Sequence, residues 1–161
     1  MTSKLIELMT EPLPSISSQK KLSYRTNQRE VRKLYNIINE EIFDNKLPPA
    51  KLEVKSHCKG YWGICIAQSF SHKRKSSECI IRLSDKWYCK QWLINTLAHE
   101  MVHQYQWDVY SKQRHDEGKE PIMSHGSSFF MYRRKLAKFG IVLKRSSGAN
   151  RWFKHQRLDK C

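Results

Sequence analysis

The sequence predicts an α+β domain in which three main helices pack on a small sheet of three to four strands. Residues 26–49 show helical hydrophobic periodicity, and residues 86–110 read as a second, longer helix. Between them lie short segments rich in β-branched and aromatic residues, which favour strands. A chain of 161 residues is long enough for a single hydrophobic core, so one domain is expected.

The first helix is predicted within residues 26–49 because its apolar residues recur at intervals of three and four. Thr26 or Asn27 can cap it, and Asn45 followed by Pro48 ends it. The residues expected on its buried face are Val31, Leu34, Tyr35, Ile38 and Ile42.

The strands are predicted at residues 51–56, 61–70 and 78–84. Residues 71–78, SHKRKSSE, are expected to form an exposed basic hairpin tip. Ser84 or Asp85 then caps the long helix of residues 86–110.

The last third of the chain is predicted to contain a loop, a helix and a hairpin. Residues 111–124 carry Gly118, Pro121 and six charged residues and are expected to be a loop. A third helix at 125–139 stops at Gly140, and a terminal basic hairpin or tail follows.

Three regions are expected: a loosely ordered N-terminal arm at 1–25, a core at 26–145 and a basic tail at 146–161. The first 21 residues lack the apolar core of a signal peptide, and no apolar run is long enough to span a membrane. The five cysteines are odd in number and contain no CxxC pair, which favours reduced thiols in a reducing compartment.

The charge balance predicts a polyanionic partner. Thirty Lys and Arg against fifteen Asp and Glu give a net charge of +15 and a pI near 9.8, as expected of a protein that works near nucleic acid. A solvated basic surface is the alternative. The candidate nucleic-acid contacts are Lys73, Arg74 and Lys75 in the hairpin tip and Arg151, Trp152, Phe153, Lys154 and Arg157 in the tail.

The motif His99-Glu100-Met101-Val102-His103 is the strongest functional signal. Two histidines four apart on a helix leave the same face, so both can bind one Zn²⁺ ion. Glu100, beside the first histidine, can accept a proton from a water molecule without being a ligand. Without a metal, a buried glutamate with two histidines would be expensive to desolvate, which favours a metal site.

A catalytic zinc normally needs a third protein ligand, and the downstream sequence offers several. His115 lies in the charged loop, where Glu117 or Glu120 could supply a carboxylate instead. His125 stands at the predicted start of the third helix and is followed by Gly126, which allows close approach of the backbone. A rigid helix start is a better platform than a loop, so His125 is preferred.

Four segments, IFDNKLP, YWG, TLAHEMVHQYQ and SHGSSFF, resemble the SprT-like zinc metallopeptidase domain in order and spacing. The resemblance covers about residues 27–143 and extends to the Spartan-type proteases, which degrade proteins crosslinked to DNA. It implies a zincin-like fold and one Zn²⁺ ion held by His99, His103 and His125, with Glu100 as the catalytic base. It also implies a sheet edge that can hold an extended substrate strand.

The chain is therefore expected to be a zinc-dependent endopeptidase acting on proteins bound or crosslinked to DNA. Tyr105 or Tyr61 is a candidate to stabilise the oxyanion. The tail offers only Cys161 and His155, so the resemblance is to a minimal form without the C-terminal zinc ribbon of many relatives.

Two other functions stay open: a nucleic-acid-binding module with a structural zinc, and a zinc hydrolase for a non-peptide amide. The expected location is cytoplasmic and nucleoid-associated, or nuclear in a eukaryote. The expected assembly is a monomer without a membrane partner.

Overall fold

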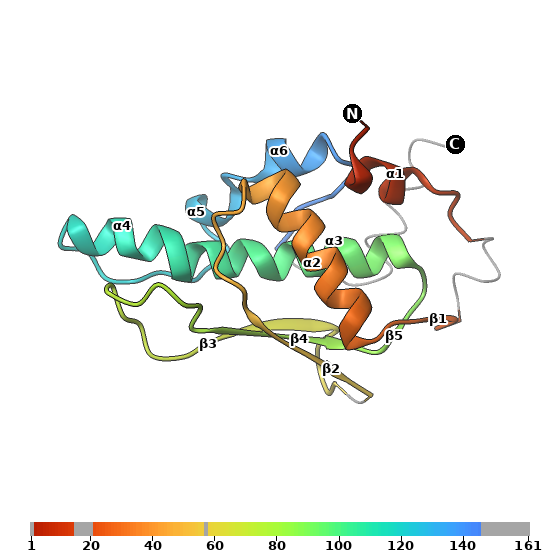
Figure 1. Ribbon diagram of the computed structural model, residues 1–161, viewed down its shortest axis with the longest axis horizontal. Coiled ribbons are helices and arrows are strands. Elements are labelled where there is room, and N and C mark those ends of the chain that lie inside the picture. Colours follow the sequence, from red (N-terminus) through yellow and green to blue (C-terminus); the bar gives the residue numbers. More distant parts are fainter. Residues whose placement is uncertain (1, 15–20, 57, 146–161) are drawn as a thin grey trace.

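The computed structural model describes residues 2–14, 21–56 and 58–145, and these form the expected α+β fold (Figure 1). The helical segments are α1 (Lys4–Thr10), α2 (Gln28–Phe43), α3 (Lys90–Tyr105), the π-helix η2 (Gln106–Tyr110), α4 (Ser111–Asp116), α5 (Ser127–Phe130) and α6 (Arg133–Ala137). The strands are β1 (Tyr24–Arg25), β2 (Lys51–Lys55), β3 (Gly63–Ala67), β4 (Cys79–Ser84) and β5 (Lys86–Trp87).

Helix α2 confirms the first predicted helix. Asn27 is its cap: the Asn27 side chain accepts a hydrogen bond from the backbone N–H of Glu30 at 2.9 Å. The helix ends at Phe43, and its C-cap residue Asp44 adopts the left-handed conformation at φ 54°. The five apolar residues expected on the inner face are all buried, so the hydrophobic periodicity predicted the buried face of this helix correctly.

The three-stranded sheet has the order β2–β4–β3, with β2 parallel and β3 antiparallel to the central strand. Along β4, Cys79, Ile81 and Leu83 are buried and alternate with less buried residues, as a strand with one covered face requires. Strand β3 lies at the edge of this sheet. The connection from β3 to β4 carries the exposed basic tip that the sequence predicts.

Helix α3 contacts strands β3 and β4 and also helix α2, which crosses it at an angle in the view of Figure 1. Every residue from Gln91 to Tyr105 is buried, so this helix is covered on all sides. It begins later than predicted, because residues 86–87 form β5, which pairs with β1. Trp87 is fully buried there, and its ring N–H donates to the backbone carbonyl of Ser84 at 2.7 Å.

The prediction of a loop from residue 111 is wrong for its first part, because the chain stays helical through η2 and α4. The carbonyl of Gln106 accepts hydrogen bonds from both the backbone N–H and the hydroxyl of Ser111, which supports the wider turn. The third predicted helix is instead two short helices, α5 and α6, and it begins at Ser127 rather than at His125.

Residues 4–10, within the segment predicted to be a loose arm, form helix α1. Leu5 is fully buried, and its backbone N–H donates to the Glu41 carboxylate at 2.9 Å. The basic tail, with Arg151, Trp152, Phe153, Lys154 and Arg157, lies outside the described residues. Across the described part of the chain, no helix combines the length and apolar character needed to cross a membrane.

Candidate metal centre

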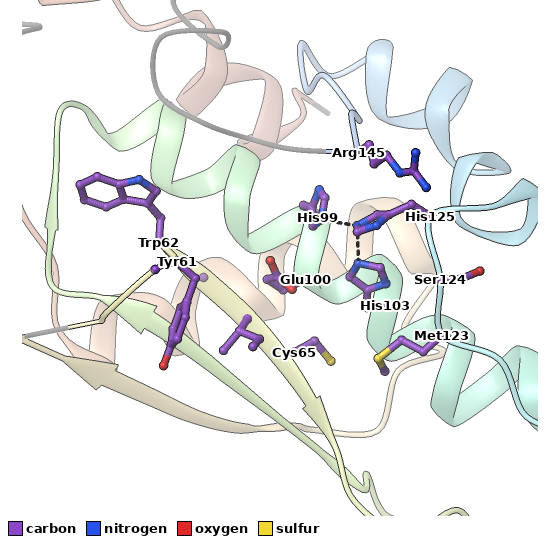
Figure 2. A pocket seen from close by; sticks show the side chains of 13 residues that line it. Tyr61, Trp62, Cys65, His99, Glu100, His103, Met123, Ser124, His125 and Arg145 are labelled. Atoms are coloured by element: carbon purple, nitrogen blue, oxygen red, sulfur yellow. Dashed lines mark hydrogen bonds between the residues drawn. The ribbon is translucent and has the colours of Figure 1, made fainter.

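Three histidine side chains converge on one point (Figure 2). His99 and His103 leave the same face of α3, and His125 comes from the segment just before α5. The Nε2 atom of His125 lies 3.1 Å from Nε2 of His103 and 3.4 Å from Nε2 of His99. The structure thus brings together the two histidines of the motif and the preferred third candidate.

The spacing of these nitrogens fits one metal ion. Two nitrogens bound to a tetrahedral ion at about 2.0–2.1 Å lie about 3.3–3.4 Å apart. Both Nε2 separations involving His125 are close to this value. The cluster of His99, His103 and His125 can therefore hold a metal ion with three protein ligands.

Burial lowers the pKa of all three imidazoles, which favours their uncharged form. It lowers the pKa of His99 to about 3, with further contributions from His103 and His125. It also lowers the pKa of His103, although the hydrogen bond to Gln106 opposes this, and burial with the charge of Arg145 lowers the pKa of His125. Neutral imidazole is the form that binds a metal.

The ring of Phe129 packs against all three histidine rings. It is fully buried at the third position of α5, and its ring centroid lies 4.8 Å from that of His99, 4.7 Å from His103 and 4.9 Å from His125. A residue four positions after His125 thus anchors the start of α5 in the core. This packing restricts the side-chain rotations that would move the nitrogens apart.

The carboxyl group of Glu100 lies in the same pocket (Figure 2). Glu100 is buried, and burial raises its pKa to about 8. A backbone hydrogen bond from Cys65 on β3 opposes this rise, because it stabilises the charged form. The carboxyl group is thus held between α3 and the edge strand.

Strand β3 approaches α3 closely at Gly63. A Cβ atom there would lie 2.8 Å from Cγ2 of Thr96 and 2.8 Å from Cδ2 of Leu83. The glycine of the YWG segment therefore lets the edge strand form one wall of the pocket.

The pocket has a volume of about 680 Å³. Its lining is Gly60, Tyr61, Trp62, Gly63, Ile64, Cys65, His99, Glu100, His103, Met123, Ser124, His125 and Arg145. Apart from the histidines, the lining has one acidic side chain, Glu100, and one basic side chain, Arg145, which stands beside His125 at the exposed side (Figure 2).

The alternative third ligands lie elsewhere in the described structure. His115 stacks on His72, with ring centroids 3.9 Å apart. Glu117 is exposed and pairs with Lys119 at 2.8 Å, and Glu120 is exposed. Because these three residues are outside the pocket, His125 is the ligand that the geometry favours.

The two tyrosines considered for the oxyanion are separated by the fold. Tyr105 packs in the core against Phe43 and Tyr132, outside the pocket lining. Tyr61 lines the pocket, and its hydroxyl lies 3.5 Å from the guanidinium of Arg82. Of the pair, only Tyr61 remains a candidate.

The basic tip is not part of the pocket lining, and it contacts α4. Lys73, Arg74 and Lys75 are exposed. Arg74 forms an ion pair with Glu78, and its carbonyl accepts a hydrogen bond from Lys112 on α4. The tip is thereby attached to the helix that follows the metal centre.

Sequence reasoning did not identify Gln106, which contacts His103, or Arg145, which lines the pocket. Gln106 lies three positions after a candidate ligand on a helix, a spacing that brings side chains together. That spacing was an available signal for Gln106. Arg145 carried no comparable signal, because it reaches the pocket only through the path of the chain after α6.

The fold and this site define a metallopeptidase-like domain. The chain belongs to the SprT-like family, whose sequence profile matches residues 31–141. A search among curated proteins returns no match. The family match confirms the resemblance drawn from the four sequence segments.

Proposed function

We propose that the protein is a zinc-dependent endopeptidase that acts on proteins bound or crosslinked to DNA. The observation that carries the proposal is the position of Glu100. Its carboxyl group shares a pocket with three imidazole nitrogens that fit one ion, and a purely structural metal site has no use for it.

The residues would divide the work of peptide hydrolysis as follows. His99, His103 and His125 would hold one Zn²⁺ ion, which when bound lowers the pKa of a water molecule and polarises the scissile carbonyl. Glu100 accepts the proton of the attacking water and returns it to the leaving amine. The Cys65 N–H orients the Glu100 carboxylate for both transfers.

The edge strand supports a polypeptide substrate. Gly63, Ile64 and Cys65 belong to β3 and also line the pocket. An extended peptide can add to such an edge through backbone hydrogen bonds, which places its carbonyl groups next to the ligands. Recognition by backbone groups suits an enzyme that cuts many different proteins.

The DNA part of the proposal is supported by charge. The net charge is +15, and the exposed Lys73 and Lys75 have no ion pair within the described residues. Lys112 attaches their loop to α4. Phosphate binding by such residues weakens steeply as salt rises, so binding to DNA should show strong salt dependence.

The Glu100→Gln variant tests the mechanism. It keeps the size and much of the hydrogen bonding of the side chain but cannot accept the proton. We expect zinc content to stay near one ion per chain while cleavage of casein or histone, with or without DNA, falls at least about 100-fold. Native cleavage by this variant would end the proposal.

A nucleic-acid-binding module with a structural zinc remains the alternative, because the charge alone supports it. It predicts that Glu100→Gln changes neither DNA binding nor zinc content and that the native protein cleaves nothing. The same pair of proteins therefore separates the two functions.

A further inference from the structure

Two fully buried glutamines stand two residues apart on the helix that carries the metal centre. Gln104 points into the core, where its amide contacts the Tyr35 hydroxyl, the Pro48 carbonyl and the Asp108 carboxylate. Gln106 points the other way, toward the metal centre. The two amides are equally buried but have different partners. Replacing each in turn can therefore distinguish an effect on the stability of the core from an effect on the metal centre.

The partners of Gln106 fix the orientation of its amide. Nε2 lies 2.9 Å from the backbone carbonyl of Ser124, and a carbonyl can only accept a hydrogen bond. Nε2 must therefore be the NH₂ group, and Oε1 is the atom that lies 2.8 Å from Nδ1 of His103. Nδ1 must then carry the proton, so the lone pair of His103 is on Nε2, the atom that faces His125.

The same amide also positions the segment that carries the third ligand. Ser124 immediately precedes His125, and Nε2 of Gln106 lies 2.8 Å from the hydroxyl of Ser128 on α5. One side chain thus contacts a ligand on α3 and, on either side of His125, the Ser124 backbone carbonyl and the Ser128 hydroxyl. The relative position of His103 and His125 depends on it.

The π-helix adds a second connection from the same residue. The Ser111 hydroxyl donates to the Gln106 carbonyl at 2.6 Å and accepts from the Ile122 N–H at 2.9 Å. Ser111 is fully buried. Residues 122–124 are therefore fastened to η2 at two points, through the Gln106 side chain and through its carbonyl.

We propose that Gln106 is a positioning residue that sets the tautomer of His103 and the place of His125 together, so that metal affinity depends on both ends of its amide. The inference rests on the proposed metal site but does not require peptidase activity. Partners behind a metal ligand typically change metal affinity about 10- to 100-fold when they are removed.

Three variants test this inference: Gln106→Met, Gln106→Glu and the matched control Gln104→Met. Gln106→Met keeps the volume and removes both hydrogen-bonding ends. Gln106→Glu keeps the acceptor for His103 but loses the donor to Ser124. Gln104→Met removes an equally buried amide from the core.

The measurements are Zn²⁺ affinity by competition with a chromophoric chelator, the visible spectrum of the Co²⁺-loaded protein and the free energy of unfolding. We expect Gln106→Met to lose about 10- to 100-fold in Zn²⁺ affinity and to change the Co²⁺ spectrum. We expect Gln106→Glu to fall between Gln106→Met and the native protein. Gln104→Met should be less stable yet keep the native affinity and spectrum.

Native metal affinity and an unchanged spectrum in Gln106→Met would overturn the inference, and so would an equal loss of affinity in Gln104→Met. If Gln106→Met does not fold, native affinity in Gln106→Glu would overturn it. A native protein that binds no stoichiometric Zn²⁺ or Co²⁺ overturns the metal site and this inference together. Metal binding that is weakened as expected, in a protein without proteolysis, supports the inference and overturns only the peptidase function.

Discussion

The described residues contain two groups of neighbouring histidines, and of these two groups one is built as a metal centre. His99, His103 and His125 are enclosed by α3, α5 and β3, with nitrogens that converge. His72 and His115 are exposed, and their rings have centroids 3.9 Å apart and are tilted by 34° to one another. Within the described residues no third ligand joins this pair, so proximity alone does not make a ligand set.

The two groups of histidines also differ in the hydrogen bonds that orient their rings. Gln106 orients His103, and a backbone hydrogen bond with Lys144 orients His99. Among the described residues, no hydrogen bond reaches the ring of His72 or the ring of His115. Hydrogen bonds that orient the rings thus distinguish the site from the exposed pair.

Removing one histidine from each group gives the sharpest test of this difference. We expect His125→Ala to weaken Zn²⁺ binding by more than about 100-fold, because a lost ligand should matter more than a lost outer partner. His115→Ala should leave affinity unchanged. Both variants would be measured by chelator competition at one pH, and equal losses would contradict the assignment of the third ligand.

A side chain at Gly63 tests how closely β3, which forms one wall of the pocket, packs against α3. Within the described part of the chain, the exposed histidine pair has no such wall. We expect Gly63→Ala to destabilise the protein by about 1–3 kcal/mol, because its Cβ would overlap Thr96 and Leu83. Gly126→Ala is the control, since its Cβ would have a nearest contact of 3.4 Å with the Ser124 hydroxyl. Chemical denaturation measures the free energy of unfolding of both variants. Equal stability of the two would contradict the close packing at Gly63.

Reversing charge beside the exposed pair should have the smallest effect on the fold. We expect the double variant Lys73→Glu and Lys75→Glu to stay within about 0.5 kcal/mol of native stability. Its DNA affinity should fall, and the slope of log affinity against log salt should decrease by about two. Lys33→Glu with Lys46→Glu, both exposed elsewhere, is the control, and an equal loss of binding there would contradict a localised contact.

The sequence predicted those parts of the site that depend on local spacing. Two histidines four apart on a helix share a face wherever that helix lies, so His99, Glu100 and His103 could be grouped from the sequence. His125 was preferred because it stands at a predicted helix start and is followed by a glycine. The role of each residue in catalysis stays a prediction until it is measured.

The parts that the sequence did not predict depend on distant partners. Residues 86–87 were expected to be helical, but they pair with residues 24–25, about sixty positions earlier. The continuation into η2 and α4 depends on Ser111 meeting both Gln106 and Ile122, which no local pattern encodes. The Gln106 amide has a role only because residues 122–128 return to the same helix.

The position of Leu5 has a practical consequence for anyone who expresses this domain. The family match begins at residue 31, and a fragment that began there would still contain the whole matched segment. Such a fragment would lose β1 and uncover the apolar site that Leu5 fills, leaving β5 with a free edge. Purification tags therefore belong before α1, and shortened fragments should be expected to aggregate.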